Sequence, residues 1–448
     1  MAQTFRGGIH PPEMKEATSE MPLKVAPVPD EVIIPLVQHI GAPCNPIVDK
    51  GDQVKRGQMV GEPGGFVSAP VHASISGTVT KVEPRPHYLG RKIPAIVIQS
   101  DGKDEWADGL NVEAEIGSLS REQLIERIQS AGIVGLGGAT FPTHVKLSPP
   151  NNSPIDTVIL NGAECEPYVT CDDRIMIERP NDIVEGLKIM MKVLNANTGI
   201  IGIEANKPKA IETLREAVDK EPSISVATLK VKYPQGSEKQ LIYALTRRKV
   251  PAGGLPMAVG VVNQNVATTL AVYYAAKYKK PLIERALTIT GDGVEQPGNY
   301  MVRVGTSVRE LLDMAGMKPE ANKLVLGGPM MGLAQYTQDI SVTKGTNGIL
   351  VIANAESWDH TACIRCGSCV DACPMNLNPS EISIACEASD VSAIKSTQIL
   401  DCFECGSCAY VCPSKRPIVH WVKFGKAELS KLKAQNQQKA VEPVAEKK

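Results

Sequence analysis

Hydrophobic and polar positions follow two different patterns along the chain. Residues 31–105 hold short apolar runs broken by glycine and proline, such as EVIIPLVQHIG and KIPAIVIQS, and these predict a small all-β module. Residues 106–280 instead alternate strand-like runs with stretches of helical spacing. A helix is predicted over 120–131, where one face carries Leu124, Ile125, Ile128 and Ala131. Alternating strands and helices predict an α/β domain with a largely parallel sheet.

The same patterns divide the rest of the chain. Within the α/β domain we expect strands at 157–160, 199–204 and 226–232, and helices at 181–195, 207–219 and 236–246. Residues 281–350 return to short strands around one helix, which predicts a small α+β unit. The flanking regions are a proline-containing extended arm (1–30), a cysteine-rich unit (351–425) and a polar, lysine-rich tail (426–448) that we expect to be disordered.

Composition excludes several classes of function. Lysine and arginine number 48 against 49 aspartates and glutamates, for a net charge of −1, which argues against a nucleic-acid-binding protein. With 43% hydrophobic and 22% charged residues, the chain has the composition of a soluble globular protein. No apolar run approaches the length of a membrane span and the start lacks a signal-peptide pattern. We therefore expect any membrane association to be peripheral and to depend on a partner.

Twelve cysteines are present, and nine of them lie between Cys363 and Cys412, of which all but Cys386 are regularly spaced. These eight cysteines carry the motif. They form two runs of the type C-x2-C-x2-C-x3-C-P, which hold cubane iron–sulfur clusters. In such pairs the fourth cysteine of each run ligates the other cluster. One [4Fe–4S] cluster is therefore assigned to Cys363, Cys366, Cys369 and Cys412, and the second to Cys402, Cys405, Cys408 and Cys373. Two zinc sites are the alternative, but zinc motifs favour cysteine pairs separated by a longer spacer.

A glycine-rich segment, GIVGLGGATFPTHVK, runs from Gly132 to Lys146. Its glycines would let backbone amides approach a phosphate or a flat ring, and Lys146 would neutralise phosphate charge. Phe141 offers a stacking face in a chain with only 4% aromatic residues. The segment alone is weak evidence, because loops also use glycine for turns.

Part of the all-β module looks like a biotinyl or lipoyl barrel-sandwich, with GDQVKRGQMV and ASISGTV as its two halves. Carriers of that type need a lysine at the hairpin between the halves. No lysine occurs between Arg56 and Lys81, so the carrier chemistry is absent. For this all-β module the remaining interpretations are a structural role and a role as an interaction surface.

Four motifs resemble the NADH- and FMN-binding flavoprotein subunit of respiratory complex I, in the same order along the chain. GLGGATFPTHVK (135–146) is similar to that family's RGxGGAGFPTGxKW, and NGAECEP (161–167) to its NADESEPG loop. YPQGSE (233–238) resembles YxxGEE, and VVNQNVAT (261–268) resembles VNNVET. Two acidic side chains of that family are missing here, which affects NADH binding more than flavin binding.

Nearly the whole chain resembles the C subunit of the Rnf ion-translocating electron-transport complex, from the opening TFRGGIHPP to the paired cysteine runs. The resemblance implies a multidomain α/β and α+β fold: a barrel-sandwich module, a Rossmann-like FMN/NADH-binding domain, a β-grasp (soluble-ligand-binding) unit and a ferredoxin-like helical domain with two clusters. It implies FMN bound by Gly135, Gly137, Gly138, Lys146, Asn161, Asn265 and Thr268. It also implies that NADH is bound by Phe141, Glu164, Glu166 and Glu238.

The function implied by this resemblance is electron transfer in a membrane complex. NADH would give hydride to FMN, and single electrons would pass through the two clusters to partner subunits, coupled to Na⁺ or H⁺ movement. The partners would be the other Rnf subunits, including the ferredoxin-like B subunit, and through them ferredoxin. The chain would lie on the cytoplasmic face of the membrane. The alternatives are a non-catalytic iron–sulfur relay subunit of the same complex and the diaphorase subunit of a soluble hydrogenase or formate dehydrogenase.

Overall fold

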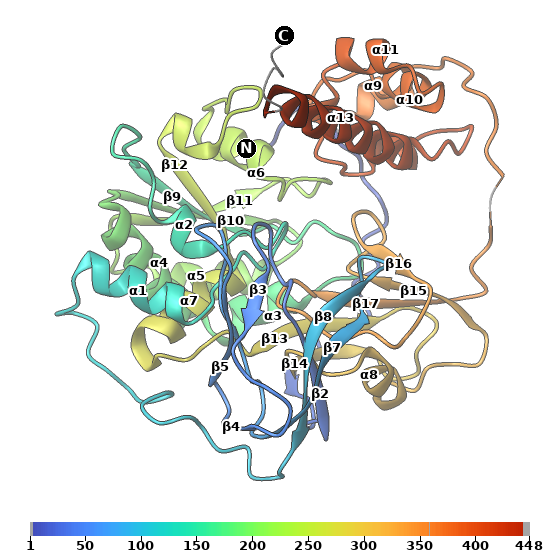
Figure 1. Cartoon of the computed structure of the whole chain (residues 1–448). Coiled ribbons are helices and arrows are strands. Elements are labelled where there is room, and N and C mark those ends of the chain that lie inside the picture. Colours follow the sequence, from blue (N-terminus) through green and yellow to red (C-terminus); the bar gives the residue numbers. More distant parts are fainter. Residues whose placement is uncertain (1–2, 358, 442–448) are drawn as a thin grey trace, which may run out of the picture.

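The computed structural model describes residues 3–357 and 359–441, whose strands form four sheets (Figure 1). None of the helices in this described part combines the length and apolar character needed to cross a bilayer. The multidomain fold expected from the sequence is confirmed by the sheet topology, with one all-β module, one parallel α/β domain, one mixed sheet and a helical C-terminal unit.

The all-β module packs two antiparallel sheets face to face. Alternate positions of its strands point into a shared core in which Val32, Ile34, Val60, Ile96 and Ile98 are fully buried. The first sheet has the order β2-β8-β7-β4, with β2 (Glu31–Pro35), β4 (Gln53–Val54), β7 (Gly77–Pro86) and β8 (Lys92–Ser100). The second has the order β3-β5-β6, with β3 (Cys44–Pro46), β5 (Met59–Pro63) and β6 (Val71–His72).

The α/β domain is built on a four-stranded, fully parallel sheet with the order β11-β10-β9-β12. Its strands are β9 (Thr157–Gly162), β10 (Thr198–Glu204), β11 (Ile224–Leu229) and β12 (Val261–Asn265). Its helices are α1 (Arg121–Ser130), α2 (Thr143–Lys146), α3 (Cys171–Glu178), α4 (Pro180–Leu194), α5 (Pro208–Ala217), α6 (Glu238–Thr246), the 3₁₀ turn η1 (Pro256–Val259) and α7 (Val266–Tyr278). The strand order reverses between β9 and β12, which makes their carboxyl ends the expected ligand-binding position.

A six-stranded mixed sheet follows in the chain, with the order β1-β14-β13-β17-β15-β16. It contains β13 (Glu284–Thr290), β14 (Gly298–Arg303), β15 (Ala321–Leu326), β16 (Leu333–Gln335) and β17 (Gly348–Ala353), with helix α8 (Val308–Met314). Its edge strand, β1 (Leu23–Val25), comes from the N-terminal arm and runs parallel to β14. The arm, expected only to be extended, therefore completes a sheet of another unit.

The arm also bridges two other units before it reaches β1. The amide of Gly8 donates to the carbonyl of Ala372 in the C-terminal unit at 2.9 Å. Ile9 and Tyr233 exchange two backbone hydrogen bonds, of 2.8 and 2.9 Å, which ties the arm to the α/β domain. The arm therefore contacts both the α/β domain and the C-terminal unit.

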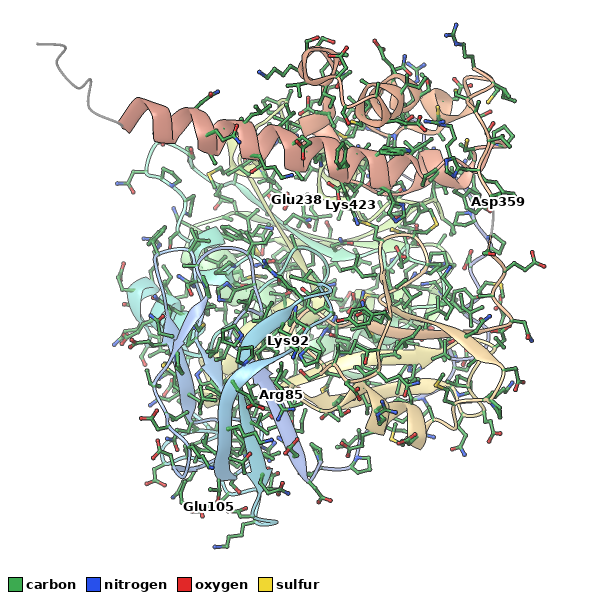
Figure 2. The ribbon with its side chains drawn as sticks, turned by 45° about the vertical axis from the view of Figure 1, so that its right-hand side comes forward. Arg85, Lys92, Glu105, Glu238, Asp359 and Lys423 are labelled. Carbon is green, nitrogen blue, oxygen red and sulfur yellow. The ribbon has the colours of Figure 1, made fainter. Side chains whose placement is uncertain are left out.

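The C-terminal unit is helical and lies above the α/β domain in Figures 1 and 2. Its elements are α9 (Ser368–Ala372), α10 (Pro379–Glu387), α11 (Val391–Ser396), the 3₁₀ turn η2 (Ile399–Asp401), α12 (Ser407–Tyr410) and α13 (Ile418–Val441). The expectation of a disordered tail from residue 426 is wrong as far as Val441, because α13 continues to that residue. Lysine, alanine, glutamine and leucine are good helix formers, and Leu429 packs into the core of this unit. Residues 442–448 lie outside the described part.

Candidate flavin and iron–sulfur sites

The carboxyl ends of β9 and β12 carry two asparagines that organise the loops around them. Asn265 caps α7, since its side-chain oxygen accepts from the amides of Ala267 and Thr268. Its side-chain nitrogen donates to a carboxylate oxygen of Asp172 at 2.6 Å. Asn161, on β9, donates to the carbonyl of Gly236 at 2.7 Å. Asn161 and Asn265, which are two of the residues expected to hold FMN, therefore lie on β9 and β12, between which the strand order reverses.

The glycine-rich loop lies directly against Asn265. Its amide at Leu136 donates to the Thr268 hydroxyl at 2.8 Å, and Gly135 donates to the carbonyl of Phe141 at 2.9 Å. A Cβ atom on Gly137 would come within 2.7 Å of the Asn265 side chain, so this position has room only for glycine. The start of the glycine-rich loop is thus fixed by Thr268 of α7 and by the carbonyl of Phe141.

Beyond these contacts the loop offers free donors. Gly137, Gly138 and Ala139 are exposed, and their amides donate to no atom of residues 3–357 and 359–441. A Cβ on Gly138 would meet nothing within 4 Å, so a ligand can approach its backbone closely. Exposed, unpaired amides of this kind fit a phosphate or the polar edge of a flat ring.

Lys146, at the end of α2, supplies a cation a few residues after these amides in the chain. Its Nζ donates to the carbonyl of Asn263 at 2.7 Å and to Oε1 of Glu238 at 2.9 Å. The side chains of Lys146 and Glu238 are 25% and 38% exposed, so both remain accessible to a ligand. Phe141, at the start of the α2 turn, is half-buried. Glu238 begins α6, below the C-terminal unit in Figure 2.

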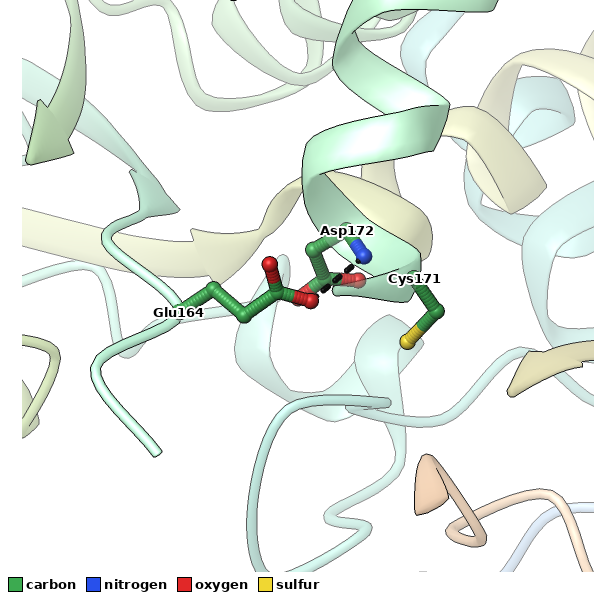
Figure 3. A group of neighbouring side chains, drawn as sticks. All are labelled: Glu164, Cys171 and Asp172. Atoms are coloured by element: carbon green, nitrogen blue, oxygen red, sulfur yellow. Dashed lines mark hydrogen bonds between the residues drawn. The ribbon is translucent and has the colours of Figure 1, made fainter. Parts of the chain in front are cut away.

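The acidic loop after β9 is turned inward. The carboxylate of Glu164 accepts the amides of Asp172 at 2.7 Å and Asp173 at 3.2 Å, so it caps the start of α3 (Figure 3). Burial raises the pKa of Glu164 to about 8, although Lys15 beside it acts in the opposite direction. Its side chain is only 3% exposed. Glu164 therefore supports the loop from its buried side and does not face solvent.

Two buried lysines, which the sequence patterns did not reveal, hold this loop. Lys15 of the arm donates to the carbonyls of Glu164 at 2.7 Å and Val169 at 2.6 Å. Lys207 donates to the carbonyl of Ala163 at 2.7 Å and lies 3.7 Å from Glu204. Both are isolated lysines in polar surroundings of the sequence, so no motif marked them.

Glu164, Cys171 and Asp172 place one potential metal-ligating atom each within 4.8 Å of one another (Figure 3). Cationic side chains already compensate their charge. Lys15 and Lys207 stabilise the carboxylate of Glu164, and Arg285 stabilises that of Asp172. Burial raises the pKa of the Cys171 thiol well above its usual value, which keeps it neutral. We interpret the group as the buried support of the α3 start.

Glu166 connects the acidic loop to the mixed sheet. Its Oε1 accepts the amides of Met330 at 2.7 Å and Met331 at 3.0 Å, in the turn between β15 and β16. A Cβ on Gly328 in that turn would come within 2.2 Å of the Glu166 side chain. The second acid expected near NADH is therefore also engaged by backbone amides.

The two cysteine sets come together as the sequence rule grouped them. One cavity is lined by Cys373 of the first run together with Cys402, Cys405 and Cys408 of the second. The other is lined by Cys363, Cys366 and Cys369 together with Cys412. Four thiols around one cavity are the donor set of a cubane cluster. We call the first set the inner cysteines and the second set the outer cysteines.

The two sets differ in their surroundings. Cys405 of the inner set packs in one apolar cluster with Ile9 of the arm and Tyr233 and Cys165 of the α/β domain. The outer cavity is lined only by residues 363–418. Cys366 of the outer set is exposed, and Ile364 beside it is 67% exposed. The inner set thus packs against the α/β domain, and the outer set lies toward the surface.

Comparison with known proteins agrees with this arrangement. Family models match an RnfC barrel sandwich hybrid domain (residues 3–103), a Nuo51 FMN-binding domain (128–274), an SLBB domain (287–334) and a 4Fe-4S dicluster domain (362–416). The C subunit of the proton-translocating ferredoxin:NAD(+) oxidoreductase complex of Clostridium ljungdahlii is 48% identical, over 96% of this chain and 94% of its own.

Two further relatives are similar over nearly the whole chain. The C subunit of the Na(+)-translocating ferredoxin:NAD(+) oxidoreductase complex of Acetobacterium woodii is 46% identical, over 95% of this chain and 97% of its own. The C subunit of an ion-translocating oxidoreductase complex of Haemophilus influenzae is 42% identical over 96% of this chain, which covers 66% of that longer relative.

Proposed function

The chain belongs to the family of C subunits of the Rnf-type ferredoxin:NAD⁺ oxidoreductase complexes, and we propose that it is the site at which NADH meets the complex. As a member of this family it has an FMN-binding domain and a 4Fe–4S dicluster domain, and it works with the other subunits of the complex and with ferredoxin. The observation that carries the proposal is the set of free amides at Gly137 to Ala139, in the loop that leads into the helix of Lys146.

The residues around the crevice fit FMN. The exposed amides of Gly137 and Gly138 and the ammonium group of Lys146 suit its phosphate, and Asn161 and Asn265 fix the loops that surround it. Thr268 and Gly135 act indirectly, because they hold the glycine loop in place. When bound, FMN takes up hydride as an electron pair and releases electrons singly, which nicotinamide cannot do.

For NADH, the structure favours the accessible residues of the predicted set. Glu238, which pairs with Lys146, and Phe141, which follows the glycine-rich loop, are partly exposed, so we assign them to direct contact with the nucleotide. Glu164 and Glu166 would act by shaping the loop, because their carboxylates accept backbone amides. No residue of the chain has to act as an acid or base in this scheme.

The positions of the cysteines suggest a direction for the electrons. The inner cysteines would hold the cluster nearer the flavin, since they pack against Tyr233 and Cys165 of the α/β domain. The outer cysteines would hold the cluster from which electrons leave for the ferredoxin-like B subunit, since Cys366 is exposed. In this proposal the chain lies on the cytoplasmic face of the membrane, and membrane subunits couple the transfer to movement of Na⁺ or H⁺.

One observation favours a second candidate function, a relay subunit that does not bind NADH. Both acids of the loop after β9 are already occupied by backbone amides, so they are less available to a nucleotide. In that case the glycine loop would be an inherited structure and only the clusters would be used.

An anaerobic titration with NADH separates the two candidates. The full chain is reconstituted with iron and sulfide and supplied with FMN, and flavin absorbance and low-temperature EPR are followed. We expect flavin bleaching and reduced-cluster signals with NADH. Cluster reduction by dithionite but never by NADH would support the relay. The chain without FMN is the control, and NADH should reduce its clusters at least about tenfold more slowly if flavin is the entry point.

A further inference from the structure

One segment of the α/β domain, Tyr233–Gln240, contacts both residues assigned to FMN, Asn161 and Lys146, and the main chain beside the inner cysteines. We propose that Tyr233 and Gln240 are positioning residues that set the reduction potential of the inner cluster and its placement against the flavin. This inference rests on the proposed function, and it goes beyond it by assigning the coupling between the two sites to named side chains.

Tyr233 makes the first connection to the inner cysteines. It is 2% exposed, and its hydroxyl donates to the backbone carbonyl of Cys405 at 2.7 Å. Around this bond Ile9, Ala372 and Cys405 form a small apolar cluster with the tyrosine ring. Water is thus excluded from a hydrogen bond that ends on the main chain of a cysteine of the inner set, so its loss would leave that carbonyl unpaired.

Gln240 makes the second connection, on the other run of cysteines. Its side-chain nitrogen donates to the carbonyl of Pro374 at 3.1 Å and lies 3.3 Å from the sulfur of Met375. The Ser237 hydroxyl donates to its side-chain oxygen at 2.7 Å, which fixes the orientation of the amide. Pro374 directly follows Cys373. The two contacts therefore fall on the two chain segments that together form the inner set.

Residues between these two contacts face the flavin side. The carbonyl of Gly236 accepts from Asn161, and its amide donates to the sulfur of Cys165 at 3.4 Å. Glu238 pairs with Lys146 at 2.9 Å. Within eight consecutive residues the contacts alternate between the two sites, so a displacement on the flavin side is transmitted to the inner cysteines through one short piece of backbone.

The outer cysteines have no such connection. Among the described residues, no hydrogen bond joins the α/β domain to a residue that lines the outer cavity. Hydrogen bonds and dipoles close to an iron–sulfur cluster tune its potential. A carbonyl deprived of its donor leaves partial negative charge near the cluster and disfavours its reduction. Loss of the Tyr233 hydroxyl should therefore lower the potential of one cluster and leave the other unchanged.

The test compares Tyr233→Phe and Gln240→Leu with the unchanged chain, all reconstituted with clusters and FMN. Tyr336→Phe is the matched control, because that tyrosine is 76% exposed. In an EPR-monitored redox titration we expect one of two cluster transitions to move to lower potential in both variants. NADH-dependent reduction should slow by about 2- to 10-fold, the factor that corresponds to one hydrogen bond.

Hydrogen–deuterium exchange gives a readout that needs neither NADH nor flavin. Amides of residues 402–408 should exchange faster in Tyr233→Phe, and those of residues 363–370 should not change. Unaltered potentials together with unaltered exchange would overturn the inference. Absence of cluster signals in the unchanged chain would instead overturn the proposed function, so the two failures are distinguishable.

Discussion

The ammonium group of Lys15 lies 3.9 Å from the carboxylate of Glu164, with both side chains almost completely removed from solvent. This pair joins the N-terminal arm to the loop that follows β9. Since the same lysine also donates to two backbone carbonyls, the arm is part of the structure of the crevice. Burial lowers the pKa of Lys15, and the ion pair and carbonyl contacts compensate the cost of its charge.

Substitution Lys15→Met should therefore destabilise the chain strongly. Removing one partner of a buried ion pair costs about 3–5 kcal/mol, because the other charge is left uncompensated. Urea unfolding followed by circular dichroism measures the change. Lys24→Met, at an exposed position of the same arm, should alter stability by less than about 0.5 kcal/mol. The double variant Lys15→Met with Glu164→Gln should recover part of the loss, and no recovery would contradict the pairing.

Substitution Lys146→Met should weaken FMN binding. The lysine is the cation closest in sequence to the free amides of the glycine loop, and loss of one charge-assisted contact of about 1.4 kcal/mol raises Kd about tenfold. Equilibrium dialysis of FMN against the chain measures this directly. Lys92→Met, on the exposed edge of β8 (Figure 2), is the control. An unchanged Kd would remove Lys146 from the flavin site.

The grouping of cysteines predicts that two substitutions within one set remove less iron than two substitutions in different sets. Cys412→Ser should leave about half of the iron, and adding Cys363→Ser should remove no more, because both line the outer cavity. Combining Cys363→Ser with Cys402→Ser should remove nearly all of it, because Cys402 lines the inner cavity. Colorimetric iron analysis of the reconstituted variants decides the matter. If Cys412 instead behaved as a partner of Cys402, the grouping would be wrong.

A third buried lysine, Lys344, makes stability depend on alkaline pH. Its ammonium group donates to the carbonyls of Pro70 at 2.7 Å and Gly132 at 2.8 Å, and burial lowers its pKa to about 8. The unfolded chain then holds more protons than the folded chain between about pH 8 and 10.5, so the contribution of Lys344 to stability rises with pH in that window.

Urea midpoints at pH 8 and pH 10 measure this effect when the unchanged chain is compared with Lys344→Met. The difference between the two chains should shift in favour of the unchanged chain as pH rises, on the order of 2 kcal/mol. A pH-independent difference would show that the Lys344 ammonium group is fully stabilised by its two carbonyl partners.

The features of this molecule that local sequence patterns determine could be predicted from the sequence. The α/β alternation, the helix over Arg121–Ser130 and the crossed grouping of cysteines follow from periodicity and spacing. The roles of Lys15, Lys207 and Lys344 do not, because an isolated lysine in a polar segment has the same sequence signature whether it is solvated or buried. Glu164 and Glu166 show the same limit, since only the tertiary approach of α3 and the turn at Met330 supplies their amide partners.

The arm has a further consequence for biosynthesis. It is translated well before its hydrogen-bonding partners at Asn299–Met301 and Ala372. At about 5–20 residues per second, the wait for Ala372 is on the order of 20–70 s. Lys15 gains its loop once Val169 has been made and β1 gains its neighbouring strand once Met301 has been made, so the contact of Gly8 with the C-terminal unit comes later than both. The contact between Gly8 and Ala372 can therefore form only after most of the chain has been translated.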